Sequence, residues 1–116
     1  MKGPAHVRTV FISHAFSADV ELNSRRVLAI ARACVREGLL PLAPQIYFPQ
    51  FIDESTERDL ALRLCLSLVG LADEVRVYGR LSPGMIVEVE HARRLGIAVI
   101  DGRTGDEIPN NGEPPR

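Results

Sequence analysis

The chain has 116 residues, of which 46% are hydrophobic and 25% charged, the length and balance of one globular domain with a single core. Its 14 basic and 15 acidic residues nearly cancel, which argues against nucleic acid and an anionic membrane surface as partners. No apolar run approaches the roughly 18 residues that span a bilayer, and the N-terminus lacks the apolar stretch of a signal peptide, so we expect a cytoplasmic protein.

The first third of the chain predicts a strand, a helix and a second strand. Residues 9–12 are β-branched and aromatic, as in a buried parallel strand. Asp19 can cap a helix that ends at Gly38, since glycine is the usual left-handed stop. Residues 39–43 then form the second strand. The apolar positions expected on one face of the helix are Val20, Val27, Ala31, Cys34 and Val35.

The middle of the chain predicts an aromatic loop followed by a leucine-rich helix. Residues 44–53 contain two prolines and three aromatic residues and cannot be helical throughout, so we expect an ordered aromatic loop. Ser55 or Thr56 opens a helix that runs to about Leu71.

That second helix bears on assembly, because its apolar residues leave almost no polar face. They are Leu60, Leu62, Leu64, Leu66, Leu68, Val69 and Leu71. A helix that is apolar all round must be covered on more than one side. The aromatic loop of the same chain is one possible cover and a second subunit is another. We favour a homodimer through the helix from Leu60 to Leu71, since two-fold contacts are the commonest assembly.

The last third predicts a strand, a helix and a final strand. Residues 75–78 form the third strand, and Ser82 with Pro83 starts a helix that runs to Gly96. Residues 97–100 form the fourth strand. Strands separated by helices indicate an α/β domain whose parallel sheet is covered on both faces, with functional residues at the carboxyl ends of the strands.

The domain is expected to cover residues 1–101. Residues 102–116 are rich in Gly, Pro, Asn and charge and have almost nothing to bury, so they are interpreted as a mobile C-terminal tail.

Two glutamates of the last helix differ in their surroundings. The residues three and four positions from Glu88 are mostly small or apolar, which places it at the border of the packed face, where partial desolvation raises a carboxyl pKa. Glu90 has Arg93 and Arg94 at the spacings of solvated ion pairs and is assigned to the surface. Glu88 is therefore the candidate catalytic residue. The alternative is a boundary carboxylate paired with an arginine.

Two loops provide candidate ligand contacts. Ser13 and His14 follow the first strand, where a doubly wound sheet places its ligand. His14 either titrates near neutrality or forms a hydrogen bond within the turn. Ser82 caps the last helix, and the free N–H groups of its first turn, beside Gly84, can receive a phosphate or carboxylate oxygen. An ordinary cap is the alternative.

Other site chemistries are absent from the sequence. There is no Gly-rich phosphate fingerprint and no serine-histidine-acid arrangement that spacing could support. Cys34 and Cys65 fall inside helical patterns among apolar neighbours, which favours packing over a disulfide, and neither has metal-ligand spacing. No metal or cofactor is expected.

A set of segments distributed along residues 8–101 carries a family resemblance. It comprises residues 10–13, 17–23, 41–44, 48–51, 72–74, 77–79 and 82–85, followed by Glu88, Ala92 and Gly96. Together they resemble an uncharacterised bacterial and phage family of nucleoside 2-deoxyribosyltransferase-like domains. The resemblance implies a three-layer, Rossmann-like or flavodoxin-like parallel sheet of four to five strands with helices on both faces.

The resemblance also implies an activity. In the wider superfamily of nucleoside 2-deoxyribosyltransferases and 2-deoxynucleoside 5-monophosphate N-hydrolases, the glutamate four residues after the helix glycine is the nucleophile, and here that residue is Glu88, following Gly84. It attacks the anomeric carbon and releases the base. The hydrolases carry a phosphate-holding serine at the position of Ser82, which favours a nucleotide over a nucleoside. The residues expected around this small-molecule ligand are Ser13, His14, Phe16, Gly79, Ser82, Gly84 and Met85.

Two departures from the superfamily pattern support an alternative. A tyrosine that hydrogen-bonds the nucleophile aligns with Phe11, which has no hydroxyl, and an aspartate that assists base departure aligns with Cys65. Residues 10–15 also look like the opening of a TIR domain, whose fold is related. The alternative is therefore a noncatalytic nucleotide-binding or TIR-like interaction domain.

Overall fold

A parallel sheet forms the centre of the computed structural model, which describes residues 6–109. Its four strands are β1 (Thr9–His14), β2 (Leu40–Leu42), β3 (Glu74–Tyr78) and β4 (Ala98–Asp101). They lie in the order β2-β1-β3-β4, and every neighbouring pair is parallel. At the centre, Phe11 of β1 lies opposite Leu42 on one side and Val75 on the other. The predicted parallel sheet is confirmed.

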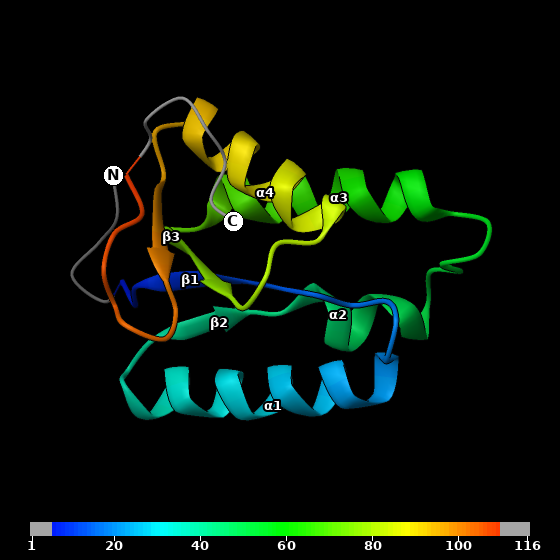
Figure 1. Cartoon of the computed structure of the whole chain (residues 1–116), viewed down its shortest axis with the longest axis horizontal. Coiled ribbons are helices and arrows are strands. Elements are labelled where there is room, and N and C mark those ends of the chain that lie inside the picture. Colours follow the sequence, from blue (N-terminus) through cyan, green and yellow to red (C-terminus); the bar gives the residue numbers. More distant parts are fainter. Residues whose placement is uncertain (1–5, 110–116) are drawn as a thin grey trace.

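Helices cover both faces of this sheet, which confirms the predicted three layers (Figure 1). They are α1 (Val20–Arg36), α2 (Pro44–Tyr47), the 3-10 turn η1 (Phe48–Gln50), α3 (Arg58–Leu71) and α4 (Pro83–Arg94). Helices α1 and α2 lie on one face, and α3 and α4 lie on the other. The expected aromatic loop is therefore ordered as two short helical turns, α2 and η1.

The two predicted N-caps are confirmed. Asp19 accepts a hydrogen bond from the Leu22 amide (3.1 Å), and Ser82 accepts one from the Met85 amide (3.3 Å). Each bond satisfies an amide that has no partner within its helix. Gly38, just after α1, has φ +80°, the left-handed conformation expected of a helix stop.

The predicted start of α3 at Ser55 or Thr56 is wrong. The helix begins at Arg58, because the Asp53 carboxylate accepts hydrogen bonds from the Ser55 amide (2.9 Å) and hydroxyl (2.6 Å). Asp is well suited to hold such a turn through its own side chain. Ser55 therefore belongs to the preceding turn, and Glu57 occupies the cap position.

Side chains alternate along β1 between the two halves of the core. Phe11 is fully buried in the larger cluster with residues of α3, α4, β3 and β4, among them Val69, Val89 and Val99. Ile12 faces the other layer, where it packs with Val27 and Cys34 of α1. Ser13, two positions after Phe11, therefore points toward α3 and α4.

The buried face of α1 is narrower than the sequence predicts. Val27 and Cys34 are buried as expected, but Val20 and Val35 are about half exposed, at 48% and 49%. Val20 is the first residue of α1, and Val35 follows the buried Cys34 directly, which turns it about 100° away from that face of the helix.

The chain returns to the sheet after β4. A turn follows Asp101, Ile100 forms an antiparallel bridge with Glu107, and the Ile108 amide donates to the Val99 carbonyl (2.8 Å). Ile108 also packs against the larger core cluster. These residues form the first part of the expected tail, while residues 110–116 lie outside the described part of the chain. The domain boundary at residue 101 stays a prediction.

One side of α3 is covered from within the chain. Phe48 and Ile52 pack on Ala61, and Cys65 and Leu68 border this cluster. The aromatic segment thus provides the intrachain cover that the sequence left as an alternative. Leu64 and Leu71 remain exposed, at 37% and 69%. Within residues 6–109, no helix combines the length and apolar character needed to cross a membrane.

Candidate active site

A hydrogen bond between β1 and α4 fixes the candidate catalytic carboxylate. The Ser13 hydroxyl donates to Oε1 of Glu88 at 2.7 Å. Ser13 is fully buried, so its hydroxyl needs a partner within the protein, and Glu88 provides it. Glu88 lies in the second turn of α4, partly buried where that helix packs on the sheet. The cap at Ser82 fixes the start of the helix and hence the turn from which Glu88 projects.

The surroundings of Glu88 favour its protonated form. Burial raises the pKa of Glu88 to about 7, and the hydrogen bond from Ser13 acts in the opposite direction by stabilising the carboxylate. No described arginine forms an ion pair with Glu88, which differs from the alternative of an arginine-paired boundary residue. Glu90 is exposed on the same helix, as predicted.

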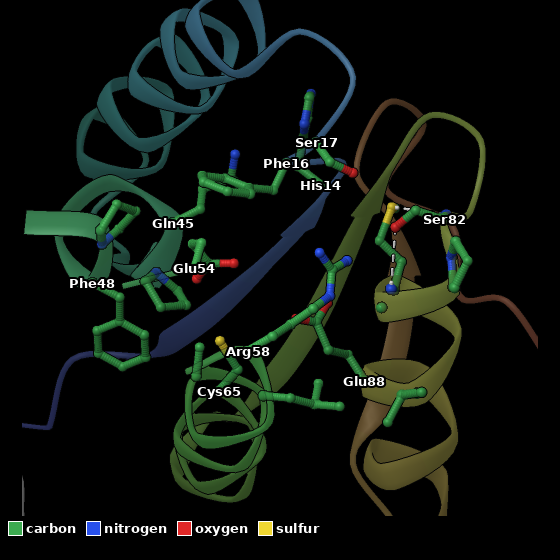
Figure 2. A pocket seen from close by; sticks show the side chains of 18 of the residues that line it. His14, Phe16, Ser17, Gln45, Phe48, Glu54, Arg58, Cys65, Ser82 and Glu88 are labelled. Carbon is green, nitrogen blue, oxygen red and sulfur yellow. Dashed lines mark hydrogen bonds between the residues drawn. The ribbon is translucent and has the colours of Figure 1, made fainter. Parts of the chain in front are cut away.

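Glu88 lines a cavity of about 310 Å³ at the carboxyl ends of the strands (Figure 2). The walls come from the end of β1 and the loop after it, from α2 and η1, and from the starts of α3 and α4. This is the edge of the sheet where a parallel α/β fold was expected to place its ligand.

The cavity brings together most of the residues predicted to surround a ligand. Those that line it are His14, Phe16, Ser82, Gly84, Met85 and Glu88. Ser13 does not line the cavity, but its hydroxyl donates to the Glu88 carboxylate that does. Gly79 is not among the lining residues. His14 Nδ1 lies 2.8 Å from the Ala15 carbonyl, in agreement with the alternative of a hydrogen bond within the turn.

Several lining residues were not predicted as site residues. They include Gln45, Phe48, Glu54, Arg58, Asp59 and Cys65. Burial raises the pKa of the Cys65 thiol to about 12, and the nearby charges of Glu88 and Glu54 add to that effect. The thiol therefore stays protonated at neutral pH. The described residues contain no group of three or more His, Cys, Asp or Glu that could hold a metal ion.

Comparison with known proteins identifies the family. The family described as "Domain of unknown function (DUF7768)" matches residues 8–101. The chain belongs to this family. It is also similar in structure to a 2-deoxyribosyltransferase from Bacillus psychrosaccharolyticus, with a TM-score of 0.59 and 17% sequence identity over 79% of this chain and 69% of that chain. No curated protein gives a significant match. The similarity shows a deoxyribosyltransferase-like fold.

Within this DUF7768 domain, the two departures noted in the sequence have distinct structural settings. Phe11 is wholly part of the core, so the residue at this position contributes packing and no hydroxyl. The hydroxyl that reaches the glutamate comes instead from Ser13, two positions later on the same face of β1. Cys65 lines the cavity near Glu88 and contributes a neutral thiol.

The raised pKa of Glu88 predicts a specific pH dependence of stability. Its folded-state pKa of about 7 lies above the ordinary value of 4.5, so the folded protein binds this proton more tightly than the unfolded chain does. The stabilisation is complete below about pH 4.5 and is lost as the pH rises through 7. Its upper limit is about 3 kcal/mol, reduced by solvent because the side chain is partly exposed.

The measurement is urea unfolding of the wild type and of Glu88→Gln between pH 4 and 8. The stability difference between the two should drift against the wild type as pH rises, whereas Glu90→Gln, at an exposed position, should show no such drift. Parallel pH profiles for all three chains would contradict the assigned pKa.

Proposed function

We propose that the protein cleaves the N-glycosidic bond of a deoxynucleoside or deoxynucleotide, as a hydrolase or a transferase, with Glu88 as nucleophile. One observation carries the proposal: Glu88 lines the cavity at the strand ends while Ser13 holds one of its two carboxylate oxygens. The other oxygen is then left for attack on a bound sugar. The deoxyribosyltransferase-like fold supports the same reaction class.

The reaction balances in two steps. In the first, a Glu88 carboxylate oxygen bonds to the anomeric carbon, the C–N bond breaks, and its electron pair leaves with the base, which takes up a proton from water. In the second, water or another base attacks the same carbon and gives up a proton to solvent, and the bond to Glu88 breaks to release the carboxylate. Two displacements on one carbon retain its configuration, as in retaining glycosidases.

The cavity suits a single small substrate. Its volume of about 310 Å³ is at the lower end of the range typical for small-molecule sites. Phe16 and Phe48 give it apolar surface against which a base can pack. Ser82 and Gly84 lie at the start of α4, where backbone amides without helical partners can bind polar substrate groups.

A second candidate function is binding of a nucleotide without turnover. It is favoured by Cys65, because a thiol with a pKa of about 12 is a poor acid for protonating a departing base. Glu88 would then contribute to ligand binding only. The two candidates differ in whether free base accumulates.

The glycosidase proposal predicts that Glu88→Ala greatly slows base release. The purified chain would be incubated with deoxynucleosides, their 5′-monophosphates and NAD, and free base followed by chromatography. Loss of the nucleophile should lower the rate roughly a hundredfold or more. The matched control is Glu90→Ala, which removes an exposed carboxylate from the same helix and should retain the wild-type rate.

Free base from the wild type that persists in Glu88→Ala would exclude Glu88 as nucleophile. Saturable binding without any base release would favour the nucleotide-binding domain instead.

Cys65 provides a test of the missing acid. In Cys65→Asp, burial and the neighbouring Glu88 and Glu54 should raise the pKa of the new carboxyl and keep it protonated, so that it can donate to the leaving base. We expect base release to accelerate at least about tenfold. Cys65→Ser, which adds a hydroxyl but no acid, should not do so. If the Cys65→Asp chain is folded, as verified by thermal unfolding, and its rate of base release is unchanged, the lack of an acid at position 65 does not limit the reaction.

We also propose a homodimer through α3, supported by the exposed Leu64 and Leu71. The chain should sediment as a dimer at micromolar concentration, and Leu64→Glu together with Leu71→Glu should shift it to monomer, because two charges would be placed in the contact. The matched control is Leu28→Glu, an exposed leucine of α1 on the opposite layer. A monomer mass for the wild type at high concentration would refute the dimer.

A further inference from the structure

Arg58 is the first residue of α3, and its guanidinium extends into the cavity (Figure 2). No other arginine or lysine of the described chain lines this space. The guanidinium has no hydrogen bond or ion pair with any described residue, although it carries five N–H donors. Its donors are therefore available to a ligand.

An ion pair within the protein does not explain why Arg58 lines the cavity. Three carboxylates, those of Glu54, Asp59 and Glu88, line the same cavity, and none of them forms an ion pair with it. Elsewhere in the chain, Arg8 and Arg76 both pair with the buried Glu74, at 2.8 Å and 2.6 Å. Arg58, which is solvent-exposed, has no such carboxylate partner among the described residues.

The stability of α3 does not explain an arginine at position 58 either. The N-terminus of a helix carries partial positive charge, so a cation in the first turn is unfavourable by a few tenths of a kcal/mol. Asp59, the next residue, has the charge that this position favours. Arg58 therefore stands at a position where the helix dipole disfavours its charge, and its side chain lines the cavity.

We propose that Arg58 binds the phosphate of the substrate and so selects nucleoside 5′-monophosphates over nucleosides. A guanidinium offers two parallel N–H donors that match two phosphate oxygens. A phosphate entering a cavity with three carboxylates is repelled unless a cation is present, and Arg58 is the arginine or lysine that lines it. The role of Glu88 in turnover rests on the proposed function, but phosphate binding by Arg58 can be tested without turnover.

The test measures binding in a chain that cannot release base. Calorimetry on Glu88→Gln, with and without Arg58→Gln, would compare each of the four deoxynucleosides with its 5′-monophosphate. Loss of a charge-assisted bidentate contact should reduce the preference for monophosphate over nucleoside about ten- to a hundredfold. Arg58→Lys should recover part of that preference, because it keeps the charge but not the two-pronged geometry. Arg63→Gln is the matched control, an exposed arginine of the same helix that does not line the cavity.

Three outcomes would overturn the role of Arg58: absence of monophosphate binding to the parent chain, an equal loss of nucleoside and monophosphate affinity in Arg58→Gln, or the same loss in Arg63→Gln. The two proposals fail separately. Monophosphate binding that depends on Arg58 without base release from the wild type would support the phosphate site and refute the glycosidase. Base release from monophosphates that is unchanged in Arg58→Gln would support the glycosidase and refute the phosphate site.

Discussion

The candidate site depends on one hydrogen bond, from the Ser13 hydroxyl to Oε1 of Glu88 (2.7 Å). It joins the central strand to a helix of the neighbouring layer at the point where the core ends and the cavity begins. A hydroxyl with no solvent exposure must find an acceptor, and a carboxylate held against the sheet loses most of its water. The Glu88 carboxylate accepts the Ser13 hydrogen bond, and that bond fixes the orientation of the carboxylate. A hydroxyl does not neutralise the negative charge as an arginine would. A pKa of about 7 follows from that balance.

The Ser13 contact also shows how the sheet of this chain accommodates Phe11. Residues 11 and 13 project from the same face of β1, one toward the hydrophobic interior and the other toward the cavity edge. A large apolar ring is stabilising at the first position because α3, α4 and β3 surround it there. A hydroxyl is stabilising at the second because Glu88 is within reach. Packing and carboxylate orientation are thus divided between two residues of one strand.

The sequence predicts the features that depend on residues close together in the chain. The caps at Asp19 and Ser82, the stop at Gly38 and the parallel order of alternating strands and helices follow from residues close together in the chain. The small and apolar helix neighbours of Glu88 also indicate its partly buried position. The contact with Ser13 joins residues 75 positions apart, and the inward course of Arg58 depends on where α3 begins. The sequence places the start of α3 at Ser55 or Thr56, but the structure places it at Arg58. The Asp53 side chain accepts hydrogen bonds from Ser55 and holds it in a turn, and residue spacing alone does not show whether Ser55 joins that turn or the helix.

Charge links the proposed nucleophile, Glu88, to the proposed phosphate site at Arg58. A phosphate bound in this cavity would raise the pKa of Glu88 further, since like charges disfavour ionisation, and the nucleophile must be ionised to attack. Arg58 would limit that rise, because a guanidinium bound to the phosphate neutralises part of its negative charge. The same residue would therefore contribute to substrate binding and to keeping Glu88 reactive once the substrate is bound. An arginine paired permanently with Glu88 would lower its pKa but leave no cation for the phosphate, and the unpaired Arg58 avoids that conflict.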